Sequence, residues 1–230
     1  MGTILVTGAN RGIGLELACQ YVEAGDYVIA TCREPEAANA LLHLKQSHQG
    51  VDIAALDVTD PVSIASLVSL LKERRVSIDL LINNAGVLYP EPVGEWGCET
   101  FTRTLRTNVV GPAMVMQSFA SLLAKGAKVV NISSGLGSFG MGIDFGGPTG
   151  TYAASKAGLN MVVAQMAPRF REKGITVVAF NPGWVKTDMG GQEAALDVEE
   201  SVSSLRASFE KLTLEDSGRF IDYNGEPLPW

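Results

Sequence analysis

The chain has few of the residues that build metal centres and disulfide frameworks. Its 230 residues include three cysteines, Cys19, Cys32 and Cys98, and two histidines, His43 and His48. The cysteines are odd in number and form no CxxC pair, a usage typical of a reducing compartment. The histidines lie in one polar helical stretch, far in sequence from any cysteine. We therefore expect neither a structural disulfide nor a metal site.

Charge and hydropathy argue against two further classes of protein. The formal net charge of -7 offers no basic face to nucleic acid. No apolar run approaches the ~20 residues that cross a bilayer. Met1 leads directly into the apolar run TILV without a charged leader, and Val6 stands where a myristoylation signal needs Ser or Thr. We expect one soluble, cytoplasmic domain spanning residues 1–230, without nucleic-acid or membrane partners.

What the chain does contain is an alternation of short apolar runs and longer helical patterns. This order is typical of a parallel sheet covered on both faces. We predict an α/β fold, a Rossmann-type doubly wound parallel sheet of about seven strands with helices on both faces. The predicted strands span residues 3–7, 27–31, 51–56, 79–83, 127–133, 175–180 and 218–223.

Helix signals separate these strands. The clearest helix begins at Thr59 or Asp60, has Pro61 in its first turn and ends in basic residues. The predicted helices span residues 59–75, 99–124, 151–172 and 197–211.

A glycine-rich turn, TGANRGIG (7–14), follows the first predicted strand and opens the first helix. Its glycines, Gly8, Gly12 and Gly14, let the backbone turn tightly and approach a pyrophosphate at the helix N-terminus. The spacing is GxxxGxG instead of the commoner GxGxxG, and a plain turn is the alternative. The position in the first βα unit favours a dinucleotide.

The end of the second strand indicates which dinucleotide. Enzymes that use the unphosphorylated form place a carboxylate there, whereas ATCREP offers Cys32 and Arg33 before the first acid, Glu34. Arg11 adds a second guanidinium, and Arg grips phosphate through a planar fork. We therefore predict NADP(H), the alternative being a solvated Arg33 that pairs with Glu34 or Glu36.

TYAASKAGLN (151–160) places Tyr152 and Lys156 one turn apart on one helix face. A nearby ammonium stabilises phenolate over phenol, which would lower the tyrosine pKa from about 10 and allow acid/base work. An ordinary exposed helix pair is the alternative. Four more motifs follow strands or open helices, where α/β sheets bind ligands: NNAG (83–86), TNVVG (107–111), NISSG (131–135) and NPGWVKTDM (181–189).

The ordered set TGxxxGIG, DV, NNAG, N, S, YxxxK and PGxxxT resembles the classical short-chain dehydrogenase/reductase family, over residues 3 to about 190. Within that family, TCREP, NPGWVKTDMGG and SGRFIDYNGEPLPW are similar to segments of the C-factor and sniffer-like carbonyl reductases. The resemblance implies an NADPH-dependent oxidoreductase that reduces a small, mostly apolar ketone or aldehyde. The competing hypothesis is an NADP(H)-binding signalling or regulatory protein with little or no turnover.

The resemblance also implies catalytic roles. Tyr152 would be the general acid/base, and Lys156 would lower its pKa and hold the nicotinamide ribose. Ser134, as the second serine of the ISS pattern, would bind the substrate oxygen, and Asn108 would anchor a relay water. Asn83 is interpreted as a residue that ties the sheet.

The same motifs also imply which residues contact the cofactor, along the whole length of the binding cleft expected for this family. Val185 and Thr187 match positions that hold the nicotinamide carboxamide, and residues 84–86 match a wall of the adenosine ribose. Asp57 admits two roles, accepting the adenine amino hydrogens or capping the following helix. The predicted cofactor-binding residues are Gly8, Asn10, Arg11, Gly12, Ile13, Gly14, Arg33, Asp57, Val58, Asn84, Ala85, Gly86, Tyr152, Lys156, Pro182, Gly183, Val185 and Thr187.

One departure from the family concerns the 18 positions between Ser134 and Tyr152, a longer spacing than the family commonly has. The extended loop is rich in apolar side chains, including Ile143, which we interpret as lining a substrate pocket; a dimer contact is the competing role. A homodimer or homotetramer built on the helices at 99–124 and 151–172 stays open. The predicted pocket residues are Leu136, Phe139, Met141, Phe145, Trp184 and Met189.

Overall fold

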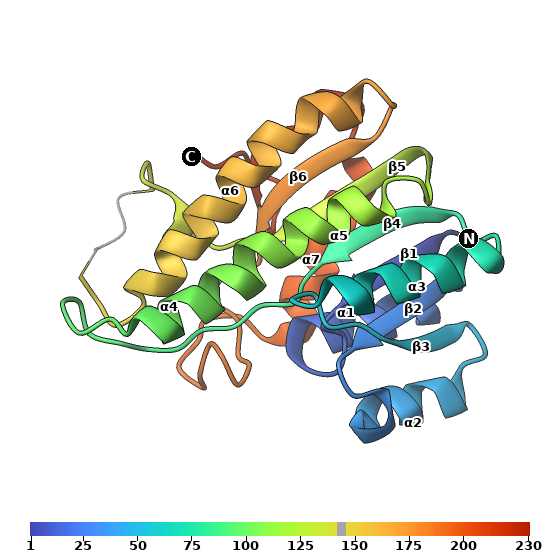
Figure 1. Cartoon of the computed structure of the whole chain (residues 1–230), viewed down its shortest axis with the longest axis horizontal. Helices are drawn as coiled ribbons and strands as arrows, with labels where there is room; N and C mark the ends of the chain where they lie inside the picture. Colours follow the sequence, from blue (N-terminus) through green and yellow to red (C-terminus); the bar gives the residue numbers. More distant parts are fainter. Residues whose placement is uncertain (142–145) are drawn as a thin grey trace.

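A computed structural model describes residues 1–141 and 146–230 as one layer of parallel strands between two layers of helices (Figure 1). The seven strands are ordered β3-β2-β1-β4-β5-β6-β7, and every adjacent pair is parallel. This confirms the predicted doubly wound α/β fold. The strands are β1 (Thr3–Thr7), β2 (Tyr27–Cys32), β3 (Val51–Ala55), β4 (Ile78–Asn83), β5 (Leu123–Ile132), β6 (Thr176–Asn181) and β7 (Phe220–Asp222).

The helices divide between the two faces of the sheet. Leu17, Leu41 and Leu205 share one buried cluster, so their helices cover one face. These are α1 (Gly12–Glu23), α2 (Asn39–Ser47) and α7 (Val198–Lys211). The other face carries α3 (Pro61–Glu73), α4 (Cys98–Leu105), α5 (Gly111–Phe119) and α6 (Gly150–Arg171); short turns η1 (Pro35–Ala37), η2 (Arg106–Val110), η3 (Gly135–Gly137) and η4 (Leu214–Asp216) connect elements.

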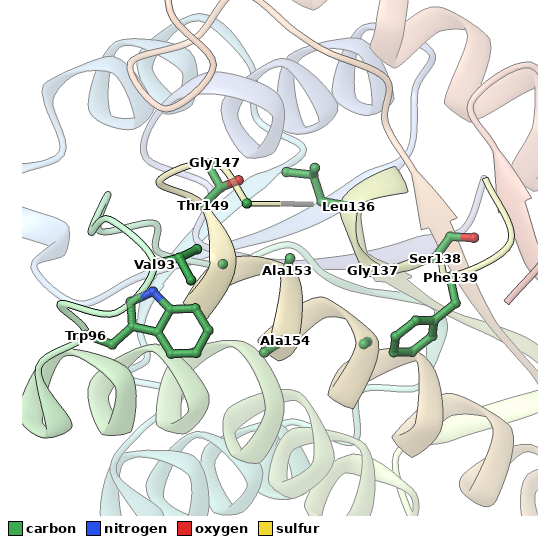
Figure 2. A pocket seen from close by; sticks show the side chains of 13 residues that line it. Val93, Trp96, Leu136, Gly137, Ser138, Phe139, Gly147, Thr149, Ala153 and Ala154 are labelled. Carbon is green, nitrogen blue, oxygen red and sulfur yellow. The ribbon is translucent and has the colours of Figure 1, made fainter. Parts of the chain in front are cut away.

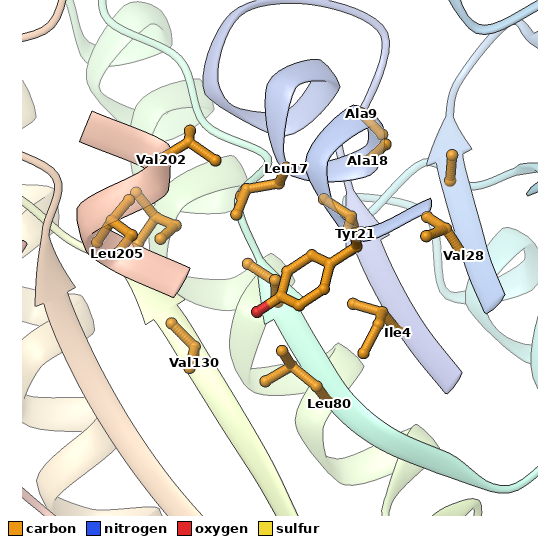
Figure 3. Close-up of a cluster of buried hydrophobic side chains, with 14 of the residues drawn as sticks. Ile4, Ala9, Leu17, Ala18, Tyr21, Val28, Leu80, Val130, Val202 and Leu205 are labelled. Carbon is orange, nitrogen blue, oxygen red and sulfur yellow. The ribbon is translucent and has the colours of Figure 1, made fainter. Parts of the chain in front are cut away.

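The core follows from the period of two along each strand. On β5, Val129 joins the cluster under α3, α5 and α6, and its neighbour Val130 joins the cluster under α1 and α7. Figure 3 shows the second cluster, in which Tyr21 of α1 lies between Leu80 and Leu205. Burial of each aliphatic side chain in these two clusters stabilises the fold by about 1.5–3 kcal/mol. The strands are therefore apolar on both faces, as a sandwiched parallel sheet requires.

Helix α3 begins where the sequence predicts. Asp60 is the N-cap residue, and its side chain accepts a hydrogen bond of 2.9 Å from the Val62 amide. Pro61 occupies the first turn, where its missing N–H costs nothing.

The predicted single helix over 99–124 is wrong in two respects. The helical path runs from α4 through a π-helical turn, η2, into α5, and it ends at Phe119. Residues 120–122 form a turn, and Leu123 pairs with Ile78 of β4. Ala120 and Leu122 of this turn are good helix formers, but pairing with the buried β4 strand overrides their local propensity.

A pair of asparagines ties the middle of the sheet. Asn83 at the end of β4 donates to Asn131 of β5 at 2.9 Å, and Asn131 donates to the Val178 carbonyl at 3.1 Å. This confirms Asn83 as a sheet-tying residue.

Candidate active site

A cleft of about 1280 Å³ lies along the carboxyl ends of the strands. Its walls come from the segments that follow β1 through β6, which is the edge where open α/β sheets bind ligands. All eighteen residues predicted to bind the cofactor line it. The fold thus gathers in one cleft motifs that are separated by up to 179 positions in the chain, from Gly8 to Thr187.

The glycine turn is held in place by the loop after β4. Asn84 donates to the carbonyls of Thr7 and Gly8, both at 3.0 Å, and the Thr7 hydroxyl accepts from the amides of Asn84 and Ala85. A Cβ on Gly14 would overlap the Gly8 carbonyl oxygen and the Asn84 side-chain nitrogen, and because the first is a backbone atom, glycine is required there. The residues of NNAG therefore shape the turn as well as the cleft wall.

The N-terminus of α1 opens into the cleft and fits an anionic group. Its N-cap residue, Arg11, makes no side-chain capping bond, and the first turn carries no acidic residue. The first amides of a helix lack internal partners and favour negative charge. The pyrophosphate of a dinucleotide is a group that such a turn accepts.

Tyr152 and Lys156 are both buried on α6 and face the cleft, with 9% and 4% of their surface exposed. The Lys156 ammonium lies 5.4 Å from the centroid of the Tyr152 ring and donates to the Ile132 carbonyl at 2.7 Å. The exposed-pair alternative is thus wrong. The interaction with Ile132 fixes the lysine at the end of β5 and leaves its other N–H groups free to donate.

The protonation of this pair differs from the sequence-based expectation. Burial raises the pKa of Tyr152 to about 12, and a hydrogen bond from Ser134 acts in the opposite direction. Burial also lowers the pKa of Lys156 to about 8. We expected the ammonium to lower the tyrosine pKa; in the protein alone, desolvation of the phenolate outweighs any such effect.

Ser134 and Ser133 have separate environments. Ser133 is buried, and its hydroxyl donates to Asn160 at 2.6 Å, so it stabilises the packing of β5 on α6. Ser134 is only half-buried, lines the cleft and hydrogen-bonds Tyr152. Its oxygen accepts from the Leu136 amide at 3.2 Å, so its single proton can be donated to Tyr152 or to an acceptor bound in the cleft. The choice of Ser134 is consistent with this geometry.

Asn108 lies at the centre of the π-helical turn and is fully buried beneath the cleft. Its side chain accepts from the Val87 amide at 2.9 Å and donates to the Val87 carbonyl at 2.8 Å. It also donates to Ser155, whose hydroxyl bonds the Tyr152 carbonyl. Widened turns of this kind are frequent at functional sites, and this one connects the loop after β4 to α6.

Charged residues at the nucleotide end take positions that the sequence left open. Arg33 is exposed at the end of β2, and among the described residues it forms no ion pair with Glu34 or Glu36. Arg11 pairs with Asp188 at 3.1 Å across the cleft. Asp57 accepts from the amide and hydroxyl of Thr59, and it does not cap α3.

The predicted substrate-pocket residues do not all meet. Leu136, Trp184 and Met189 line the cleft, whereas Phe139 lines an adjoining apolar pocket of about 430 Å³ (Figure 2). Leu136 and Thr149 border both spaces. Met141, 38% exposed, lines neither. Phe145 and Ile143 lie outside the described residues.

Four residues in or behind the cleft carry no sequence motif of their own. Asn160 follows Tyr152 and Lys156 at a spacing of four, and this periodicity could have identified it as a buried polar residue of the same helix face, where it accepts from Ser133. Tyr89, Arg103 and Arg106 line the cleft itself. No motif marks these three, because their positions depend on how the loop after β4 and helix α4 fold back over the cleft.

Over residues 1–141 and 146–230, none of the helices combines the length and the hydrophobicity of a membrane span. Within the same residues, no group of three or more His, Cys, Asp or Glu side chains is arranged to hold a metal ion. The described cysteines are all free thiols.

Comparison with known proteins agrees with the fold. The family model described as short chain dehydrogenase matches residues 2–196. The NADPH-bound carbonyl reductase from chicken fatty liver superposes with a TM-score of 0.94, at 35% identity, over 100% of this chain and 99% of that one. The carbonyl reductase Sniffer of D. melanogaster superposes at 0.92, with 32% identity over the whole of both chains. The C-signal protein of Myxococcus xanthus is 39% identical over 157 residues, 66% of this chain and 93% of its own.

Proposed function

The chain belongs to the short chain dehydrogenase family, and from that premise we propose that it is an NADPH-dependent carbonyl reductase. It reduces a small, mostly apolar ketone or aldehyde, and in reverse oxidises the alcohol. The observation that carries the proposal is the buried Tyr152 and Lys156 pair beside Ser134 in the nucleotide cleft. Its proposed location is the cytoplasm.

NADPH is the proposed cofactor because Arg33 directly follows β2 in the cleft, where enzymes that use the unphosphorylated dinucleotide place a carboxylate. A guanidinium binds the 2′-phosphate through a bidentate fork. The chicken carbonyl reductase, similar along the whole chain, is an NADPH-bound structure. When bound, the cofactor supplies the hydride.

The protein's own groups manage the proton. The Tyr152 hydroxyl is protonated at neutral pH, since its pKa lies well above 7, and it can give that proton to the carbonyl oxygen. Ser134, fixed by the Leu136 amide, donates a hydrogen bond to the same oxygen. The Lys156 ammonium stabilises the phenolate left behind, and its remaining N–H groups hold the ribose hydroxyls. Asn108 anchors the loop after β4 through its two hydrogen bonds with the Val87 backbone.

The second candidate is a signalling protein that binds NADP(H) and turns over nothing. The similarity to C-signal favours it. The enzyme is preferred because a binder gains nothing from Tyr152, Ser134 and Asn108 together.

Tyr152→Phe separates these two functions. Without a proton donor, the variant is expected to lose at least about 100-fold in NADPH oxidation with a carbonyl panel, while NADPH binding followed by fluorescence stays near wild type. Equal turnover by Tyr152→Phe and wild type would overturn the proposed acid. A wild type that binds NADPH but reduces no member of the panel would favour the signalling role.

A further inference from the structure

The charge of the cleft is opposite to that of the chain. The whole chain has a formal net charge of -7, yet its cleft is lined by six cationic and three anionic side chains. A cleft of one sign focuses the electrostatic field and concentrates ligands of the other sign. The cations are Arg11, Arg33, Arg103, Arg106, Lys156 and Lys186; the anions are Glu34, Asp57 and Asp188.

Two of these cations have neither a task in the proposed reaction nor a carboxylate partner. Arg103 and Arg106 lie three positions apart on α4 and η2. Arg11 pairs with Asp188 and Lys186 with Asp197, but no carboxylate of the described chain is within 4.0 Å of either arginine. Glu99, one turn before Arg103, is not paired with it. The two guanidiniums therefore remain available to an anion in the cleft.

These two arginines point to different ends of the cleft. Arg106 donates to the Thr59 carbonyl at 2.9 Å, beside the loop after β3 where the nucleotide end lies. Arg103 donates to the Tyr89 hydroxyl at 3.2 Å, and its guanidinium carbon lies 5.0 Å from the Tyr89 ring centroid. The stacked ring and the hydrogen bond hold the guanidinium in one orientation.

Tyr89 belongs to the catalytic end. Two residues later, the Glu91 amide donates to the Pro148 carbonyl at 2.8 Å. Pro148 and Thr149 directly precede α6 and line the same cleft as Tyr89, and Tyr152 lies in the first turn of that helix. The Arg103 guanidinium is thus on the side of the cleft where the carbonyl substrate would enter.

We propose that Arg103, oriented by Tyr89, recognises a carboxylate on the substrate. The proposed substrate is then an aldehyde or ketone with an apolar body and with an anionic group distant from the carbonyl. The apolar body would contact Leu136, Trp184 and Met189, which line the cleft. Because the guanidinium presents a planar pair of donors, a carboxylate matches it better than a neutral acceptor does. This inference rests on the proposed reductase function.

The test uses two probes that differ in one charge, 4-formylbenzoate and its methyl ester. Wild type is expected to reduce both with NADPH and to prefer the acid, through a lower KM. In Arg103→Gln the ratio of kcat/KM for acid over ester falls about tenfold, the lower range for a charge-assisted hydrogen bond because the site is open to water. Raising ionic strength lowers the same ratio in wild type.

Arg169→Gln is the matched control, because Arg169 is exposed on the last turn of α6 and outside the cleft. It removes the same charge and should keep the wild-type ratio. A direct readout comes from calorimetric titration of the protein–NADP⁺ complex with 4-formylbenzoate, where only Arg103→Gln should weaken binding.

The outcomes separate the inference from the function. If the ester is reduced but Arg103→Gln keeps the acid-to-ester ratio, the carboxylate site is refuted and the reductase stands. If Arg103→Gln instead weakens NADPH binding, the arginine serves the cofactor and the inference fails. If wild type reduces neither probe and 4-formylbenzoate does not bind in the titration, the site is refuted as well.

Discussion

Lys156 is an amine buried at an energetic cost. Its pKa is lowered from 10.5 to about 8 by burial. Between these two values the unfolded chain binds more protons than the folded one, so the free energy of unfolding rises with pH. Below about pH 8, Lys156 is protonated in both the folded and the unfolded chain, so the folded protein bears the full free-energy cost of burying the charge. The hydrogen bond to Ile132 offsets part of that cost.

Replacing Lys156 with Met should remove this pH dependence. In the cofactor-free protein, the stability of wild type relative to Lys156→Met is expected to increase from pH 8 to pH 10, by up to about 1.4 kcal/mol per pH unit. Urea unfolding at several pH values measures it. Lys211→Met, at an exposed position, controls for the loss of a lysine. A pH-independent difference between wild type and Lys156→Met would contradict the assigned burial cost.

At the scale of elements, the contact between η3 and α6 brings Ser134 to the catalytic helix. Gly137 packs so closely that an added Cβ would lie 2.7 Å from the Lys156 carbonyl carbon and 2.9 Å from the Ala157 nitrogen. Asn160 donates to the Gly137 carbonyl at 3.3 Å. The last residues of the chain support the same segment, since the Ser138 hydroxyl donates to the Pro229 carbonyl at 2.6 Å.

Gly137→Ala should therefore damage both stability and catalysis. Backbone atoms cannot yield as a flexible side chain would, so we expect a loss of about 1–3 kcal/mol together with a lower kcat, because Ser134 and Tyr152 are moved apart. Chemical unfolding and NADPH-oxidation assays measure the two effects. Gly147→Ala is the control, since nothing lies within 4 Å of its added Cβ. Equal behaviour of the two variants would mean that η3 does not position Ser134.

For the whole molecule, the cleft joins both halves of the sheet. Residues after β1, β2 and β3 form its nucleotide end, and residues after β4, β5 and β6 form its catalytic end. A ligand that contacts both halves binds only the folded chain and stabilises it by mass action.

NADP⁺ should consequently raise the melting temperature more than NAD⁺ does. A cofactor concentration of 100 times its Kd stabilises the folded chain by about 2.7 kcal/mol. In a chain of this size, each kcal/mol raises the melting temperature by about 2–4 °C. In Arg33→Asp the preference is expected to shift toward NAD⁺, because a carboxylate repels the 2′-phosphate and accepts from a ribose hydroxyl. Differential scanning fluorimetry with both cofactors measures this. A larger shift with NAD⁺ in wild type would contradict the cofactor assignment.

Local patterns in the sequence determined the fold and most of the cleft. Strands and helices have fixed periods, so apolar spacing and caps such as Asp60 located them. The carboxyl ends of parallel strands lie at the same edge of the sheet, so the motifs that follow the first six strands were expected to lie close together. The cleft contains residues from each of them.

Only the tertiary structure decided the rest, because it depends on contacts between distant residues. The end of α5 is determined by pairing with β4, and the pKa of Tyr152 by its burial. Phe139 lines the adjoining apolar pocket and not the cleft, whereas Leu136, three residues earlier, borders both spaces. The placement of Arg103 against Tyr89 likewise joins a helix to a loop 14 residues earlier, a contact that no local spacing encodes.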